Sequence, residues 1–372
     1  MKKLVWPLFI IFFLAGGLIA ILIGEVVLPP EPRPESVEAI SEKWTESGHA
    51  DRESESFVHW DEDEPPEVPT NCAKCHSAYG YLDYLGEDGS TEQVVDEAAT
   101  IGSVVNCFVC HNPTASEKDT AYFPSGAAIS DMGQTANCAE CHQGRTSTFR
   151  VEDAIAGLPE DEVNEDLGFI NVHYKIAAAT RYGTEVQGGY EYPNRDYVGF
   201  YEHVEDYQLC TDCHDAHSLE ITANECAACH SEVSDLGDLR DVRIDDTDFD
   251  GDGDVTEGIY GEIQTIHEML YDAIQTYAAD VAGESILYAR QFPYWFIDTN
   301  GNGEADEGEV AFPNQYASWT PRLVKATYNY HMVLEDPGGF MHNAKYMIQI
   351  MYDTLEDLSQ VVSVDMGGLE RP

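Results

Sequence analysis

The strongest constraint on this chain is the pattern Cys-x-x-Cys-His, which occurs five times and uses all ten cysteines. Closely spaced cysteines commonly form disulfides or bind zinc, but neither role accounts for a histidine after every second cysteine. Covalent haem attachment does, because both thiols form thioethers while the adjacent imidazole binds the iron. The expected haem cysteines are Cys72, Cys75, Cys107, Cys110, Cys138, Cys141, Cys210, Cys213, Cys226 and Cys229, and the expected proximal ligands are His76, His111, His142, His214 and His230.

The spacing of the motifs limits the fold. All five lie within residues 72–230, which leaves too little chain to enclose each haem in a pocket of its own. We therefore predict five haems c in a mainly α fold with much irregular structure, a multihaem cytochrome c fold whose core is filled by haem. The fourth and fifth motifs are separated by few residues, so their haems are expected to be neighbours.

Histidines outside the motifs are candidates for the second axial position of each iron. Thirteen histidines are present, and eight remain after the proximal ligands. His217 follows His214 by three residues and cannot reach the opposite face of the same iron, so as a ligand it would bind a neighbouring haem. His267 and His331 fall in amphipathic helical patterns and are expected to be structural. The distal candidates are His49, His59, His173, His203, His217 and His342.

Two acidic, glycine-containing stretches resemble calcium-binding loops. Positions 1, 3, 5, 7 and 12 of an EF-hand loop are matched by Asp298, Asn300, Asn302, Glu304 and Glu309. The earlier stretch fits in two registers, one from Asp246 and one from Asp248, and its candidate ligands are Asp248, Asp250, Asp252, Asp254 and Glu257. We predict two calcium ions with a structural role; solvated turns and a regulatory calcium switch are the alternatives.

Helical periodicity follows each acidic stretch. Ile259, Ile263, Ile266, Leu270 and Ile274 recur at helical spacing, and Thr320 before Pro321 is typical of a helix start. A second stripe comprises Phe340, Met347, Met351, Leu355 and Leu358. Both stripes are expected to face the core.

The net charge limits the partners. Nineteen Lys and Arg against 69 Asp and Glu give a formal charge of −50. Phosphate contacts depend on basic residues, so nucleic acid and anionic lipid headgroups are excluded as expected partners. A basic protein, a metal ion or a mineral surface suits this charge better.

The N-terminus predicts export. Lys2 and Lys3 precede an uncharged run from Leu4 to Gly24, which is long enough to span a hydrocarbon core. We interpret residues 1–28 as an uncleaved signal anchor, with a cleaved leader as the alternative. Residues 29–44 are then a Pro/Glu-rich linker, 45–243 a pentahaem cytochrome c domain, and 244–372 a helical domain with two calcium loops that packs on it. The predicted location is the cytoplasmic membrane, single-pass, with the body on the periplasmic or extracellular side.

Several segments resemble a known superfamily. WTPRLVKATYNYHMVLEDPGGFMHNAKYMIQIMYDTLEDL is similar to the C-terminal helices of the pentahaem cytochrome c nitrite reductase and hydroxylamine oxidoreductase superfamily. With SGHAD, FVHW, CAKCH, HYKIAAATRYGTE and CHDAHSL, the chain resembles membrane-associated polyhaem cytochromes of that relationship over most of residues 45–362. The resemblance implies that His342 is a distal ligand. It departs from the nitrite reductases because none of the five motifs ends in lysine.

Three functions are compatible with these observations. The first is a membrane-anchored electron carrier with bis-histidine haems, which receives electrons from a membrane quinol-oxidising partner and passes them to another cytochrome, a metal or a mineral. The second is a multihaem reductase or oxidase of small nitrogen or sulfur compounds, which requires one open haem. The third is a subunit of an extracellular cytochrome filament, a homo-oligomer in which a histidine of one chain binds a haem of the next.

Overall fold

The computed structural model describes residues 35–205, 207–243 and 245–372. The predicted signal anchor and the first residues of the predicted linker lie outside the described residues. Within the described ranges, no helix combines the length and the hydropathy that crossing a bilayer requires.

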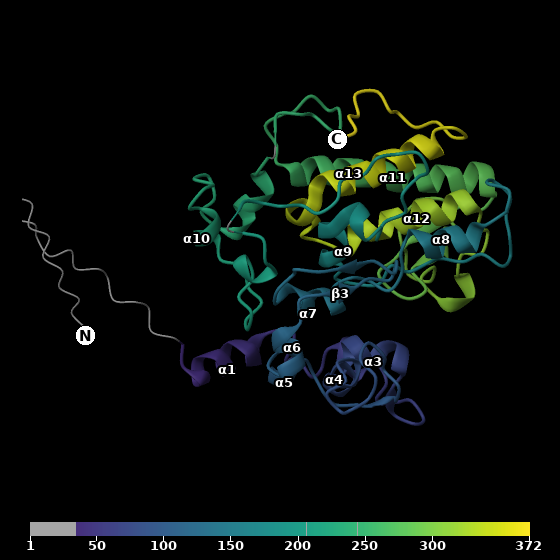
Figure 1. Ribbon diagram of the computed structural model, residues 1–372. Helices are drawn as coiled ribbons and strands as arrows, with labels where there is room; N and C mark the ends of the chain where they lie inside the picture. The colour runs from purple at the N-terminus through teal and green to yellow at the C-terminus, as the bar shows by residue number, and fades with distance from the viewer. Residues whose placement is uncertain (1–34, 206, 244) are drawn as a thin grey trace, which may run out of the picture.

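Short helices and long helices occupy different regions (Figure 1). Helices α3 to α6 lie in a lower lobe, α10 lies to one side, and α11, α12 and α13 form the upper part together with α8 and α9, while α7 lies between the two lobes. The α-helices are α1 (Val37–Glu46), α2 (Glu55–Val58), α3 (Thr70–His76), α4 (Ala78–Tyr84), α5 (Cys107–Cys110), α6 (Pro113–Glu117), α7 (Thr135–Cys141), α8 (Thr148–Ile155), α9 (Ala177–Tyr182), α10 (Ala223–Cys226), α11 (Ile259–Tyr277), α12 (Pro321–Leu334) and α13 (Gly339–Leu358).

The described strands form three small antiparallel pairs. Strand β1 (Glu67–Val68) pairs with β2 (Ala99–Thr100) in the register Glu67 to Thr100. The other pairs are β3 (Ala121–Tyr122) with β4 (Ala128–Ile129), and β5 (Ile286–Tyr288) with β6 (Trp295–Ile297). Five further short helical turns are η1 (Gly183–Glu185), η2 (Cys210–Asp212), η3 (Leu236–Asp241), η4 (Ala278–Ala282) and η5 (Phe312–Asn314). The protein is therefore mainly helical with much irregular structure.

The helices of the motif region are short because the sequence starts and stops them repeatedly. Asn106 caps α5 by accepting a hydrogen bond from Phe108, and Asn112 caps α6 by accepting one from Ala115. In the described part of residues 47–243, α8 is the longest helix, with eight residues. The sequence of this region has no long apolar stripe at helical spacing, so the Cys-x-x-Cys-His motifs lie in or beside short helical turns.

The long helices agree with the sequence periodicity. Ile259, Ile263, Ile266, Leu270 and Ile274 of α11 are all buried, which confirms the predicted stripe. The second stripe is confirmed on α13 for its methionines and leucines, while its phenylalanine is partly buried. The predicted start of α12 is also confirmed, since the Thr320 side chain accepts from the Leu323 amide and Pro321 occupies the first turn.

One hydrophobic core crosses the predicted domain boundary near residue 244. It extends from Ala121 to Val362 and includes side chains of α7, α9, α11, α12 and α13. Buried Asn329 of α12 fixes this junction, because it accepts from the Tyr190 amide at 2.7 Å and donates to the Tyr190 carbonyl at 3.0 Å. The C-terminal helices thus share a core with the residues that follow the second motif.

Most of helix α1 falls inside the predicted linker of residues 29–44, and the helix contacts the body of the protein. Lys43 donates to Asp215 at 2.7 Å, and the Trp44 indole donates to the Val105 carbonyl at 2.9 Å. Residues 37–46 are therefore attached to the motif region rather than forming an extended spacer.

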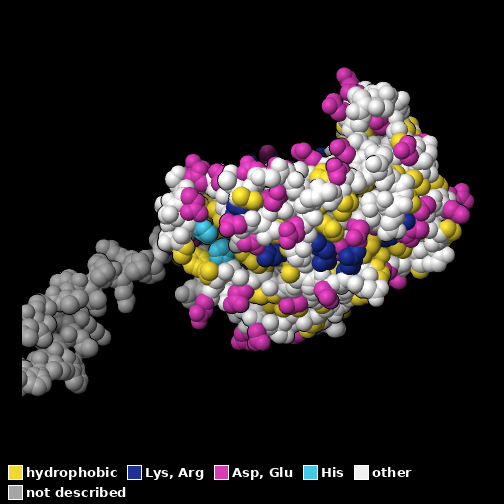
Figure 2. Space-filling view, turned by 90° about the horizontal axis from the view of Figure 1, so that it is seen from above, with side chains coloured by type: hydrophobic (Ala, Val, Ile, Leu, Met, Phe, Trp, Pro, Cys, Tyr) yellow, Lys and Arg dark blue, Asp and Glu magenta, His cyan; other side chains and the backbone are white. Residues whose placement is uncertain are grey.

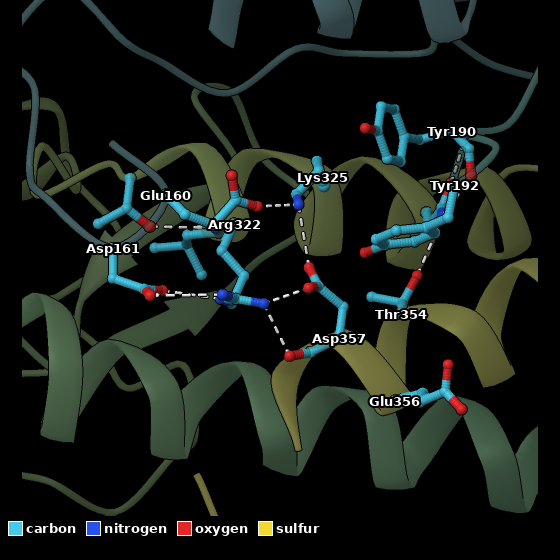
Figure 3. A network of polar contacts seen from close by, with 12 residues as sticks. Glu160, Asp161, Tyr190, Tyr192, Arg322, Lys325, Thr354, Glu356 and Asp357 are labelled. Atoms are coloured by element: carbon cyan, nitrogen blue, oxygen red, sulfur yellow. Dashed lines mark hydrogen bonds and ion pairs between the residues drawn. The ribbon is translucent and has the colours of Figure 1, made fainter. Parts of the chain in front are cut away.

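A partly buried ionic network holds residues 160–161 against α12 and α13 (Figure 3). Arg322 donates to Asp161 at 2.7 Å and also to the carboxylate and the carbonyl of Asp357. Lys325 pairs with Glu160 and, at 3.0 Å, with Asp357. The two buried cations pair with three carboxylates, of which Asp357 is buried while Glu160 and Asp161 are partly exposed.

The excess of acidic over basic residues in the sequence is visible on the surface of the protein. Figure 2 shows acidic side chains spread over the face seen from above, with few basic side chains, gathered toward its middle. Histidines appear at one edge of this face beside hydrophobic side chains.

Candidate haem-binding sites

Each Cys-x-x-Cys-His motif forms or borders a short helical turn. The five turns are α3, α5, α7, η2 and α10. Residues three apart lie on one face of a helix, so α3, α5 and α7, which contain both cysteines of their motifs, direct the two thiols to the same side. All ten cysteines lie in the described ranges, and none of them pairs with another in a disulfide. Among the described residues, the groups close enough to share a metal ion consist of carboxylates rather than cysteines.

Four motif histidines each face a second histidine. The ring-centre distances are 5.8 Å for His76 with His173, 6.2 Å for His111 with His217, 6.3 Å for His142 with His49 and 6.1 Å for His230 with His203. Two imidazoles on opposite sides of one metal, each bonded at about 2.0–2.1 Å, have ring centres roughly 6 Å apart. The residues present therefore fit a metal held between two imidazoles at four of the five motifs.

Hydrogen bonds orient several of these rings. The Nδ1 atom of His76 lies 2.8 Å from the Ser56 carbonyl, and that of His142 lies 2.9 Å from the Lys175 carbonyl. The Nδ1 atom of His214 lies 3.2 Å from the Leu219 carbonyl. A carbonyl only accepts, so Nδ1 carries the proton and Nε2 keeps the lone pair that a metal requires.

Burial keeps two of the facing rings neutral. It lowers the pKa of His49 to about 4, with a smaller contribution from His142. Burial likewise lowers the pKa of His173 to about 4, with Arg145 and His76 adding to the effect. A neutral imidazole at physiological pH is the form that binds iron.

The fourth motif lacks such a facing ring in the described structure. His214 belongs to it, and His342 lies partly buried near Cys210 of the same motif. Burial lowers the pKa of His342, but the Asp336 carboxylate, 2.8 Å from Nδ1, outweighs burial and raises it. His342 is thus close to this motif, with Nδ1 bonded to a carboxylate, as in many metal-binding histidines.

His59 differs from the other distal candidates. It is exposed, its Nδ1 lies 2.7 Å from Glu55, and its ring contacts Trp60 at a ring-centre distance of 4.9 Å. Trp60 in turn contacts His76, whose facing histidine is His173. The structure therefore brings His173 rather than His59 opposite the first motif.

The motifs are not neighbours in sequence order. Cys75 of the first motif donates to the Glu140 carbonyl at 3.7 Å, and Cys141 of the third donates to the Lys74 carbonyl at 3.9 Å. The two thiols interact, which lowers the pKa of Cys75 and raises that of Cys141.

The third motif also neighbours the fourth. The thiol of Cys138 raises the acidity of the Cys210 thiol, whose pKa falls to about 6, and the Cys210 amide donates to Thr135 of α7 at 3.2 Å. Burial and, to a smaller extent, Cys226 of the fifth motif raise the pKa of Cys213 of the fourth, so these two cysteines lie close together. Helix α7 therefore carries the motif that touches both the first and the fourth.

Several charged residues near the motifs were not singled out from the sequence. The positive charge of Arg145 acts to lower the pKa of Cys72, His76 and His173. The charge of Arg181 acts in the same direction on the pKa of Cys210 and His342. Guanidinium groups beside a haem site suit its propionates, which are carboxylates. No motif marks these arginines, because their role depends on residues distant in sequence.

The predicted calcium ligands lie in two hydrogen-bonded loops. Asp248, Asp250 and Asp252 form one group whose oxygens all lie within 4.8 Å of one another, and Asp250 and Glu257 form another with Glu262. Glu262 was missed by the sequence pattern because it lies beyond the loop, in the first turns of α11.

The chain is similar to large polyhaem cytochromes. It is 26% identical over 343 residues to the C-type polyheme cytochrome OmcB of Geobacter sulfurreducens, an alignment that covers 77% of this chain and 43% of OmcB. It is 22% identical over 379 residues to the C-type polyheme cytochrome OmcC of the same species, covering 83% of this chain and 45% of OmcC. The chain spans less than half the length of these curated relatives. No protein-family model and no solved structure matches.

These similarities support a polyhaem c-type cytochrome. They agree with the interpretation of the motifs as haem c attachment sites and with a role in electron transfer.

Proposed function

We propose that the chain carries five haems c and transfers single electrons outside the cytoplasm. The observation that supports this most strongly is the set of four histidine pairs, each joining a motif histidine to one from a distant part of the chain. When bound, haem supplies a one-electron iron couple whose potential depends on axial ligands, burial and nearby charge.

The polypeptide contributes position and electrostatics. The paired cysteines would hold each group in place, and at the four motifs with paired histidines the two imidazoles would leave no position for a substrate. Contacts between motifs that do not involve the cysteines, such as the ion pair of Lys74 with Glu140 at 3.0 Å, keep neighbouring sites close. Carboxylates dominate the surface and favour the oxidised, more positive iron, which lowers the potential.

The finer assignments extend this proposal. Residues 1–28 are a membrane anchor, the body lies on the periplasmic or extracellular side, and His342 is the distal ligand of the fourth motif. A membrane quinol-oxidising protein is the donor, and another cytochrome, a metal or a mineral is the acceptor. The relationship to the pentahaem nitrite reductase and hydroxylamine oxidoreductase superfamily belongs to the same proposal.

Intact-mass measurement of the exported protein tests the haem count. We expect the 41.3 kDa polypeptide, corrected for any leader removal, to gain the mass of five haems. The double variant Cys226→Ser/Cys229→Ser should gain four. A colourless product with the mass of the bare polypeptide, made beside a control cytochrome that matures normally, contradicts the proposal.

A multihaem reductase is the second candidate, and one observation favours it. His214 of the fourth motif has no facing imidazole at ring-pair distance in the part of the chain that the structure describes, unlike the other four motif histidines. Electron paramagnetic resonance and carbon monoxide binding separate the two functions. Low-spin signals alone and no carbon monoxide binding support the carrier, whereas a high-spin signal that His342→Ala leaves unchanged supports the reductase.

A further inference from the structure

The two acidic loops have the same internal geometry. Asp248 accepts from the Gly251 amide at 2.6 Å and from the Gly253 amide at 2.8 Å. Asp298 accepts from Gly301 and Gly303 at the same two distances. Asp248 thus occupies in the first loop the place that Asp298 has in the second, which selects the register that starts at Asp248.

A glutamate closes each loop, but from different positions. Glu309, at position 12 of the second loop, accepts from the amide of Thr299 at 2.8 Å. In the first loop position 12 is Ile259, which is buried in the core as the first residue of α11. The glutamate that closes the first loop is instead Glu262, whose carboxylate accepts hydrogen bonds from the amides of Phe249 at 2.8 Å and Asp250 at 2.9 Å.

Buried carboxylate oxygens in both loops have no hydrogen-bond partner. They are Oδ2 of Asp250, Oε1 of Glu257 and Oε2 of Glu309. Asp250 and Glu309 are each only 6% exposed. An unpartnered charged oxygen is costly in such a site unless a cation binds it. In the first loop Asp250 belongs to two groups whose oxygens lie within 4.8 Å of one another, one with Asp248 and Asp252 and one with Glu257 and Glu262, and 4.8 Å is the span of two ligands on opposite sides of one calcium ion. Glu262 already pairs with Arg243 at 2.7 Å.

We propose that each loop binds one calcium ion, the first through Asp248, Asp250, Asp252 and Glu257, with Glu262 holding the loop from α11, and the second through Asp298, Asn300, Asn302 and Glu309. All of these donors are oxygens, which suit a hard cation and disfavour zinc. The number of protein oxygens and the flexible loops suit calcium better than magnesium, which is held by few protein ligands and keeps its waters.

Helix α11 connects the two sites. Its N-terminal turns hold Glu262, while Tyr271 and Gln275 donate to the Gly303 carbonyl in the second loop at 3.2 Å and 2.9 Å. The amide of Glu370 near the C-terminus donates to the Phe249 carbonyl of the first loop at 3.0 Å. Calcium therefore fixes both ends of α11, and with it the core that contacts the motif region.

Calcium titration of the full-length, haem-loaded protein after chelation tests the inference. Calorimetry should report two bound calcium ions, confirmed by elemental analysis after dialysis. The variant Asp250→Asn/Glu257→Gln should bind only one, as should Glu309→Gln. The exposed neighbours Asp246→Asn and Glu307→Gln serve as matched controls that keep both ions.

Unchanged stoichiometry in both site variants would overturn the inference, as would binding of magnesium with equal or higher affinity. Haem content and far-ultraviolet circular dichroism show whether a variant has folded. If a variant fails to fold, the wild-type protein remains decisive, because calcium should raise its melting temperature by several degrees and magnesium should not. The absence of both calcium binding and a thermal shift in the wild type also contradicts the inference, while leaving the haem proposal intact.

Discussion

The ammonium group of Lys74 lies 3.0 Å from a carboxylate oxygen of Glu140, and both residues occupy variable positions within Cys-x-x-Cys-His motifs. Lys74 belongs to CAKCH on α3, and Glu140 belongs to CAECH on α7. Glu140 is fully buried and also pairs with Lys118 at 2.9 Å. The residues between the cysteines thus join two attachment sites that are far apart in sequence.

Removing the Glu140 carboxylate should destabilise the protein. Glu140→Ala leaves Lys74 and Lys118 without their shared partner, and breaking a buried ion pair costs about 3–5 kcal/mol. Urea denaturation followed by circular dichroism should show this loss. Exposed Glu117→Ala on α6 is the control, with an expected change below about 0.5 kcal/mol. Equal effects of the two variants would show that the ion pairs contribute nothing.

Changing the ligand opposite His76 should alter one haem potential. His173→Met replaces an imidazole with a thioether, which raises the midpoint potential, here by on the order of 100 mV for one haem. Potentiometric titration measures it. His59→Met is the matched control, because His59 contacts Trp60 rather than His76, and it should leave all potentials unchanged. The opposite pattern would make His59 the ligand.

Stability should depend on pH through His267. Burial lowers its pKa to about 4 from an ordinary value of 6.5, although Nε2 lies 2.9 Å from the Tyr330 carbonyl. Between these values the unfolded chain binds a proton that the folded protein does not, so stability falls as pH falls from 6.5 toward 4. The loss attributable to His267 reaches about 3 kcal/mol.

His267→Gln should reduce that slope while keeping a hydrogen-bond donor near Tyr330. Urea midpoints measured from pH 7 to pH 4 provide the comparison, with exposed His59→Gln as control. A slope in His267→Gln identical to that of the wild type would refute the assignment.

Loss of Arg322 should separate the loop at residues 160–161 from the C-terminal helices. Arg322 is 5% exposed and bonds Asp161 and Asp357 together (Figure 3), so Arg322→Ala should cost about 3–5 kcal/mol. Lysine restores the charge but cannot form the same forked contacts, so Arg322→Lys should recover only part of the loss.

Urea midpoints should rank Arg322→Ala below Arg322→Lys and both below the wild type. Arg195→Ala removes a partly exposed pair with Glu356 and a contact of 3.9 Å with Asp353, which keeps its closer partner Arg371 at 2.8 Å, and should cost less than about 1 kcal/mol. A cost for Arg322→Ala no greater than that for Arg195→Ala would show that the network is energetically unimportant.

Local patterns predicted those features that depend on neighbouring residues. The stripe of α11 and the Thr320 cap of α12 follow from helical periodicity and capping, which act over a few residues. The second acidic loop matches the EF-hand pattern because all of its predicted ligands lie within residues 298–309. The sequence pattern did not identify Glu262, because this residue lies in the helix that follows the first loop and reaches back to the Phe249 amide.

The sequence alone determined the chemistry of attachment, since two thiols and an imidazole at fixed spacing specify covalent haem whatever the surrounding fold. Only the tertiary structure decided which distant groups meet: His173 rather than His59 opposite His76, α3 against α7, and a core shared across residue 244. The physical reason is that covalent and helical geometry act between neighbours in sequence. Pairing between distant segments depends on how the whole chain buries its apolar surface and neutralises its buried charges.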